Sequence, residues 1–213
     1  MRILKKTLRY LTFLFLTGII ISRCYVHDCP NMNEYIANDN KFTAEHLSDS
    51  TFIVNDYSIY VDFSLPSCQD RLWLISGFRE DYLLYSGVVL HGKGRNSTAA
   101  KPEFSNEIGS ECSSLGVYRT DGFTTMSNGI EAIKLIGLSE SNSNAEQRGI
   151  FIHPCVLATL LPFNLKNVNF PLTKACEGCF AVSYPTYYKI KKYVKEYPKT
   201  TLLFAYYGKT LKP

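Results

Sequence analysis

The sequence has no excess of positive charge outside its first segment. Its 213 residues carry a formal net charge of +4, but residues 1–23 hold five basic residues and no acidic one. The rest of the chain therefore has 18 basic and 19 acidic residues. Because a nearly neutral domain lacks the electrostatic footprint that a phosphate backbone requires, we do not expect nucleic acid as a partner.

An apolar run long enough to span a bilayer, about 20 residues, is also missing. The apolar run at residues 10–21 (YLTFLFLTGIII) is shorter and follows four basic residues, an order typical of secretory signals. We expect residues 1–23 to be a signal peptide that is cleaved near residues 22–24. The alternative is an uncleaved N-terminal anchor, which would associate the protein with a membrane. In both cases the remaining chain faces a non-cytoplasmic compartment.

Extremes of composition are absent as well. Hydrophobic residues make up 46% of the chain and charged residues 20%, which is typical of a globular protein. The length suits one domain rather than two, and we find no internal repeat. Residues 24–50 are polar and are expected to form a leader or linker, whereas residues 51–213 are expected to form the domain.

The patterning of the domain predicts a mainly β fold with one or two helices. Apolar and polar residues alternate over residues 53–63, as in a half-buried strand. Residues 184–197 instead carry apolar side chains at helical spacing, opposite a set of lysines, and predict an amphipathic helix. Residues 91–116 are rich in Gly, Ser and Asn, and loops of that length usually serve function. The remaining strand-like runs are residues 71–76, 82–90, 116–118, 130–138, 149–153 and 200–207.

Seven cysteines are present, and an odd number leaves at least one unpaired unless Cys24 is removed or modified. In an oxidising compartment an unpaired thiol is either buried and inert or is the working residue. The other six are Cys29, Cys68, Cys112, Cys155, Cys176 and Cys179.

The strongest candidates for chemistry lie between residues 150 and 182. His153 ends an apolar run, and Cys179 follows Gly178 directly before the apolar residues FAV. Backbone N–H groups at such a turn stabilise a thiolate and can form an oxyanion hole for acyl transfer. A Cys and a His from separate strands are the minimum for a nucleophile and its base.

Two other interpretations of these residues compete. Cys176 and Cys179 form a C-x-x-C pair, which is consistent with a structural disulfide or a redox pair, although we see no thioredoxin-like βαβ context. Together with His153 and Cys155 they also offer four zinc ligands. The zinc deaminase signature is not met, because its Glu after the His and its Pro before the Cys pair are absent.

Five phrases occur in order along the domain: VDFSLPS (61–67), HGKG (91–94), FSNEIGSECSSLGVY (104–118), LIGLSESNSNAEQRGIFIH (135–153) and EGCFAV (177–182). In this combination residues 60–207 resemble the murein L,D-transpeptidase catalytic domain, in the branch typical of exported Gram-negative proteins. The resemblance implies a β-sandwich-like or barrel-like fold with few helices, which agrees with the strand pattern.

The resemblance also implies roles for individual residues. Cys179 matches the nucleophile of the family's S/T-x-G-C motif, His153 matches the base, and Gly178 falls where a tight turn presents the thiol. His91 matches the histidine of an HGxG phrase, for which a structural and a substrate-orienting role both stay open.

Two departures from the family pattern concern the substrate site. Cys176 stands where the motif has Ser or Thr, so it either fills that position or forms a disulfide with Cys179 that would block attack. Many relatives have an Arg shortly after the catalytic Cys, whereas Phe180 and two further apolar residues follow here. Arg148 is the substitute we consider for binding a substrate carboxylate.

The resemblance predicts a cysteine acyltransferase that cross-links peptidoglycan stem tetrapeptides by L,D-transpeptidation (3→3), with no metal or other cofactor. An L,D-carboxypeptidase or a lipoprotein-anchoring enzyme would use the same chemistry with another acceptor. The alternative from a different class is a non-catalytic wall-binding module with a structural Cys176–Cys179 disulfide. We expect a monomer located in the periplasm or otherwise associated with the cell envelope.

Overall fold

The computed structural model describes residues 57–67, 69–76, 83–94, 96–98, 101–160 and 176–208. The expected signal peptide and leader lie outside the described residues, so both stay predictions. Cys24, Cys29 and Cys68 lie outside them too. Within the described ranges, no helix has the length and hydropathy needed to cross a membrane.

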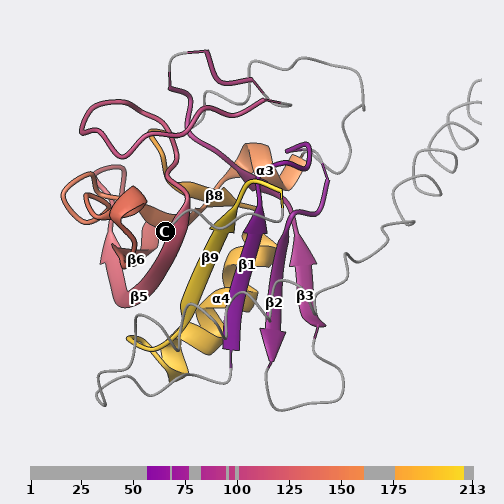
Figure 1. Cartoon of the computed structure of the whole chain (residues 1–213). Helices are drawn as coiled ribbons and strands as arrows, with labels where there is room; N and C mark the ends of the chain where they lie inside the picture. Colours follow the sequence, from indigo (N-terminus) through magenta and orange to yellow (C-terminus); the bar gives the residue numbers. More distant parts are fainter. Residues whose placement is uncertain are drawn as a thin grey trace, which may run out of the picture. The chain divides into compact units, whose positions relative to one another are not determined.

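The described strands form one nine-stranded sheet in the order β3-β2-β1-β9-β5-β6-β7-β8-β4 (Figure 1). Neighbouring strands are antiparallel except for two parallel pairs, β1 with β9 and β7 with β8. The strands are β1 (Tyr57–Asp62), β2 (Leu72–Ser76), β3 (Leu83–Gly87), β4 (Val89–Leu90), β5 (Gly116–Thr125), β6 (Glu131–Gly137), β7 (Phe151–Pro154), β8 (Phe180–Val182) and β9 (Leu202–Tyr206).

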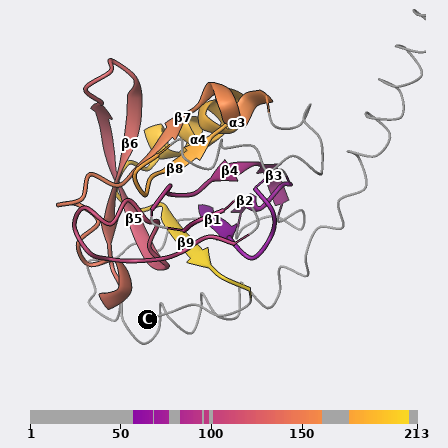
Figure 2. The same ribbon diagram turned by 90° about the horizontal axis from the view of Figure 1, so that it is seen from above.

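The sheet curls back on itself, because its two end strands are neighbours in the chain. Only Val88 separates β3 from β4, although they stand at opposite ends of the strand order. Figure 2 shows β7 and β8 on the opposite side of the core from β1, β2 and β9. The expected mainly β fold, a sandwich-like or barrel-like sheet with few helices, is therefore confirmed.

Arg71 lies at the seam where the curled sheet meets itself. Its backbone N–H donates to Gly87 O at 3.1 Å, and its guanidinium Nε and Nη2 donate to Val89 O at 2.8 and 2.6 Å. The side chain is fully buried and lies over the ring of Phe63, 5.1 Å from the centroid. Arg71 thus links the end of β3 to β4 through hydrogen bonds to both.

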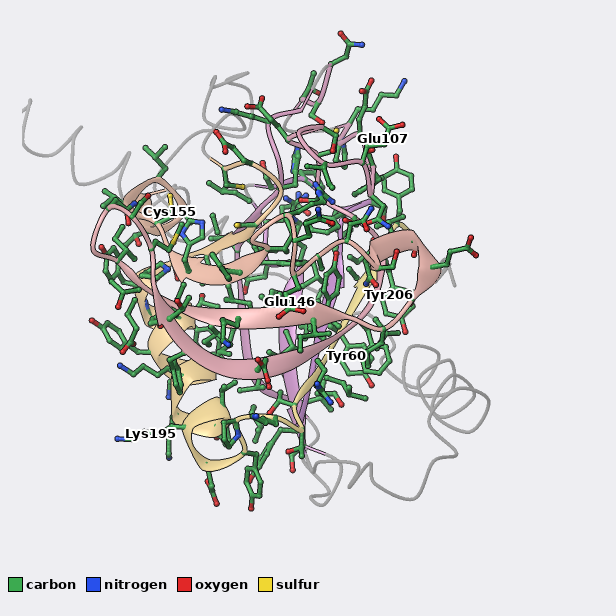
Figure 3. All side chains as sticks on the ribbon, turned by 90° about the vertical axis from the view of Figure 1, so that its left-hand side faces the viewer. Tyr60, Glu107, Glu146, Cys155, Lys195 and Tyr206 are labelled. Atoms are coloured by element: carbon green, nitrogen blue, oxygen red, sulfur yellow. The ribbon has the colours of Figure 1, made fainter. Side chains whose placement is uncertain are left out.

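The main core lies inside the curl and is completed by α4 (Tyr184–Glu196). Ser183 caps this helix by accepting a hydrogen bond from the backbone N–H of Thr186 at 3.2 Å, a standard N-cap contact. Tyr187, Ile190 and Val194 bury one face of the helix, as the spacing predicted. Lys195 points away from the sheet on its outer side (Figure 3).

Two strand predictions need correction. Residues 82–90 were expected as one strand but form β3 and β4, because β3 pairs with β2 while β4 pairs with β8. Residues 116–118 are only the start of β5, which continues to Thr125 through a register shift between Thr120 and Phe123. The polar residues and the glycine within this stretch hide its strand character from the sequence pattern.

The second helix, α3 (Val156–Leu160), directly follows β7. Residues 91–115 contain no strand among their described positions apart from an isolated bridge between Phe104 and Ser113. The expectation of a long irregular loop is confirmed there. This loop region lies against the turn that precedes β8, and so it builds one wall of the site described next.

Candidate active site

The parallel pairing of β7 with β8 sets the geometry of the site. His153 pairs with Ala181, and Ile152 pairs with Phe180. Side chains alternate between the two faces of a strand, so Cys179 shares the face of Ala181 and therefore that of His153. The two predicted catalytic residues thus lie on one face of the sheet, with His153 on β7 and Cys179 directly before β8.

The thiol of Cys179 lies in a mostly enclosed position directly before β8. Its Sγ atom is 3.4 Å from Gly149 O and accepts from the backbone N–H of Phe151, also at 3.4 Å. Only 6% of the residue is exposed. Burial raises the pKa of the thiol to about 11, with the Phe151 amide and Arg148 opposing the shift. The thiol is therefore protonated at neutral pH.

His153 is also buried, and one hydrogen bond orients its ring. Its Nδ1 atom lies 3.1 Å from Pro154 O, and because a carbonyl oxygen only accepts, Nδ1 carries the proton and Nε2 keeps its lone pair. Burial lowers the pKa of the imidazole, with the hydrogen bond to Pro154 opposing the shift. The lone pair of Nε2 is therefore available to accept a proton, which the predicted role of general base requires.

Gly178 occupies a turn that strongly favours glycine. Its φ is +109°, a backbone conformation that L side chains rarely adopt. A Cβ atom at this position would lie 2.6 Å from Cys112 O and 2.9 Å from Arg148 Nη2. The predicted tight turn before the nucleophile thus has a steric cause in the loop packed against it.

Cys176 uses its thiol to hold the same turn. Its Sγ atom lies 3.1 Å from Cys179 O and 3.3 Å from His91 O, and both carbonyls accept from it. Burial raises the pKa of this thiol strongly, and the side chain is buried. Cys176 and Cys179 are both free thiols. These contacts favour the interpretation that Cys176 fills the Ser or Thr position of the motif as a hydrogen-bonding residue.

Cys155 lies next to this pair, packed against the small apolar cluster that contains Cys176 and Cys179. It is half-buried and is a free thiol. A zinc site would need these sulfurs and His153 to converge. Over the described ranges, no group of three or more His, Cys, Asp or Glu side chains could hold a metal ion.

His91 stands apart from the catalytic face. It packs edge-on against Phe63, which also stacks on Phe180, and Phe180 points to the face of β8 opposite Cys179. The imidazole is fully buried, and Arg71 Nη2 donates to its Nδ1 at 3.0 Å. Burial, and then the charge of Arg71, lower the pKa of His91 to about 3. This environment favours the structural role among the two left open for His91.

Arg148 directs its guanidinium into the loop over residues 105–114. Nη1 donates to Ser105 O at 2.8 Å and to Ser114 Oγ at 2.6 Å, while Nη2 donates to Cys112 O and, at 3.4 Å, to Ser110 Oγ. These bonds hold the loop against the turn at Gly178. Binding of a substrate carboxylate by Arg148 stays a prediction, and it would have to compete with these contacts.

Sequence reasoning did not single out Ser113, which the fold brings to the centre of the site's wall. Its hydroxyl accepts from Gly92 N at 2.9 Å and donates to Gly178 O at 3.1 Å. The signal available in the sequence was weak, since Ser113 is one of several serines in a single phrase. Only its contacts to two distant segments distinguish it from the others.

The two glycines of the HGKG phrase, Gly92 and Gly94, pack closely against the backbone of residues 110–113. A Cβ atom at Gly92 would lie 2.3 Å from Glu111 O, and one at Gly94 would lie 2.3 Å from Ser110 O. Between them, Lys93 forms ion pairs with Glu111 and Glu177 at 3.1 and 3.0 Å. These charged side chains lie at the outer rim of the site and were also not anticipated.

Comparisons with known proteins bear on this arrangement. No curated protein shows a significant match to the chain. Among solved structures, a mutant form of the helical cell shape determining protein Pgp2 from Campylobacter jejuni is similar at 12% sequence identity, with a TM-score of 0.46. The alignment covers 82% of this chain and 55% of Pgp2, so the chain spans about half the length of that protein. A sequence profile of the L,D-transpeptidase catalytic domain matches residues 31–206, and the chain therefore belongs to this family.

Proposed function

We propose that the protein is a cysteine acyltransferase that forms 3→3 cross-links between peptidoglycan stem peptides, with Cys179 as nucleophile and His153 as base. The observation that supports this proposal is the pairing of β7 with β8, in which His153 lies opposite Ala181, two residues after Cys179. Because the family acts on peptidoglycan, we further propose that the domain works in the cell envelope after export by its N-terminal segment.

The reaction begins with attack of the Cys179 sulfur on the carbonyl carbon of the third residue of a tetrapeptide stem. The thiol proton passes to Nε2 of His153, and the carbonyl electrons move onto oxygen. Backbone N–H groups at the 178–179 turn stabilise this oxyanion. When the oxyanion collapses, the peptide bond breaks, and terminal D-Ala leaves as an amine after it receives the proton from His153.

The resulting thioester is then consumed by an acceptor. An amine of a second stem attacks the thioester carbonyl, gives its proton to His153, and releases the Cys179 sulfur, which regains a proton. The product is a new amide and the free enzyme. Water as acceptor gives a shortened stem, and a protein lysine gives a tethered protein, so the products distinguish the three outcomes.

The pKa directions support proton transfer during attack rather than a standing thiolate. Burial disfavours both charged forms, since it raises the pKa of Cys179 and lowers that of His153. If His153 is neutral and Cys179 is protonated until substrate is bound, the free protein avoids the free-energy cost of burying two charged groups. Cysteine is nucleophilic enough for this step without a metal ion.

The proposal is tested by intact-mass spectrometry of the purified protein incubated with tetrapeptide muropeptides, with and without reductant. We expect a covalent adduct and release of D-Ala from the wild type and neither from Cys179→Ala. Cys155→Ala serves as a matched control, because it removes a neighbouring thiol from the same cluster. Absence of adduct and of turnover in reduced wild-type protein would reject the enzyme and leave a wall-binding module.

A further inference from the structure

Ser113 connects three segments that are far apart in the sequence. Its hydroxyl lies between the backbone N–H of Gly92 and the carbonyl of Gly178, and the residue is completely buried. Its own backbone is fixed by the bridge to Phe104 and by a bond from Ser105 N to Ser113 O at 3.1 Å. The backbone that carries the hydroxyl is therefore fixed by these two contacts.

The two hydrogen bonds of this hydroxyl define its direction. An amide N–H only donates, so the Ser113 oxygen accepts from Gly92 and its one hydrogen is left for Gly178 O. A hydroxyl that both accepts and donates in a buried place has its hydrogen fixed in one orientation. The chain of bonds runs from Gly92 through Ser113 to the carbonyl that directly precedes the nucleophile.

That carbonyl belongs to the same peptide unit as the N–H of Cys179. In a trans peptide the C=O and N–H bonds point in opposite directions, and no described peptide bond is cis. By binding Gly178 O, Ser113 therefore turns the N–H of Cys179 away from the loop wall. The amide of the nucleophile itself is a usual member of an oxyanion hole in acyl transfer.

We propose that Ser113 is a positioning residue that orients the Gly178–Cys179 peptide so that the Cys179 N–H stabilises the oxyanion. This inference rests on the proposed acyl-transfer function and adds a residue to its machinery. Gly178 has a φ of +109° and no side chain of its own to fix the plane of its peptide, and the Ser113 hydroxyl supplies such a contact.

Two probes separate positioning of the oxyanion hole from general loosening of the site. Acetylation of Cys179 by p-nitrophenyl acetate passes through a tetrahedral oxyanion, whereas alkylation by iodoacetamide is a displacement at saturated carbon and forms none. Both rates are measured on the full chain by peptide mapping of Cys179. Removing an oxyanion donor outright costs about 10²–10³ in kcat, so for Ser113→Ala we expect acetylation to slow about 10- to 100-fold with alkylation within about two-fold of wild type.

Matched variants complete the design. Ser139→Ala removes another buried hydroxyl that accepts from a backbone amide, Val117 N at 2.9 Å, and we expect neither rate to change. Ser113→Thr keeps the hydroxyl and should restore most of the acetylation rate. Should Ser113→Ala not fold, Ser113→Cys carries the test, since a thiol is a weak hydrogen-bond partner and should lower acetylation selectively.

The outcomes distinguish this inference from the function it rests on. Equal loss of both rates, no loss of either, or failure of p-nitrophenyl acetate to acetylate wild-type Cys179 would each overturn the role of Ser113. Selective loss of acetylation in a protein that does not process muropeptides would instead support the role of Ser113 and reject the proposed substrate.

Discussion

The two described histidines, His91 and His153, lie in regions that give the imidazole ring different hydrogen-bond partners. At the seam of the sheet, His91 accepts from Arg71, and burial together with that charge lowers its pKa to about 3. On β7, His153 donates through Nδ1 to Pro154 O and keeps Nε2 for another partner. The contrast teaches that the partner of the first nitrogen decides whether the second is available as a base.

The largest expected effect comes from removing the base. We expect His153→Gln to lower kcat for muropeptide turnover by about 10²–10⁴, the usual contribution of general acid–base catalysis. The pH profile provides an independent check. With wild type, kcat/KM should rise with pH through the lowered pKa of His153, below 6.5, because only the neutral imidazole accepts the proton; this limb should be missing in the variant.

The same substitution at the other histidine is His91→Gln. Here we expect lower thermal stability with kcat within about ten-fold of wild type, because a partly lost structural contact acts on folding rather than on a reaction step. A loss of kcat as large as that of His153→Gln, in a variant that remains folded, would contradict the division of roles between the two histidines.

A second effect of His91 concerns stability as a function of pH. Its pKa is about 3 in the folded protein against the ordinary value of 6.5, so below pH 6.5 the unfolded chain binds a proton that the folded one does not. Stability should therefore fall with decreasing pH by up to about 1.4 kcal/mol per pH unit between pH 6.5 and 3. Urea unfolding of wild type and His91→Gln should show this extra slope in the wild type alone.

A smaller effect is expected at the turn before the nucleophile. Gly178→Ala places a Cβ atom 2.6 Å from Cys112 O at φ +109°, and we expect a loss of about 1–3 kcal/mol in the free energy of unfolding. Gly129→Ala is the control, because Gly129 has φ +79° but nothing within 4 Å of a Cβ. The difference between the two variants isolates the packing of the loop wall against the turn, and equal losses would argue against that packing.

The smallest effect is expected at the rim. Lys93 bridges Glu111 and Glu177, both exposed, and exposed ion pairs contribute little to stability. Lys93→Met should leave the melting temperature unchanged at moderate salt in a thermal scan. A clear drop in melting temperature would mean that the rim supports the turn at Gly178 in the way that Arg148 does.

Local patterns in the sequence were sufficient to predict many of the helices and strands of the fold. The helix from Tyr184 to Glu196 follows from its apolar spacing, and most strands follow from alternation and β-branched residues. The division of residues 82–90 into β3 and β4 does not, because it depends on which distant strand each half pairs with. The same holds for the buried Arg71, whose partners are carbonyls from other segments.

The residues of the candidate site also fall into those that the sequence predicts and those that only the structure reveals. Cys179, His153 and Gly178 could be proposed from a motif, since the roles of nucleophile, base and turn require particular residue types. Ser113 was not, because a serine in a loop has no local property that predicts which peptide it will bind. Arg148 was identified for a substrate role, and only its contacts with the 105–114 loop reveal its structural one.

The seam held by Arg71 also bears on how the protein behaves at high concentration. An end strand with unoccupied carbonyls is a template on which a strand of another molecule can grow. On β4 the carbonyl of Val89 already accepts two bonds from the Arg71 guanidinium, and β8 pairs with the other side of β4. The Val89 carbonyl of this end strand is thus occupied within the chain itself and is not available to a strand of another molecule.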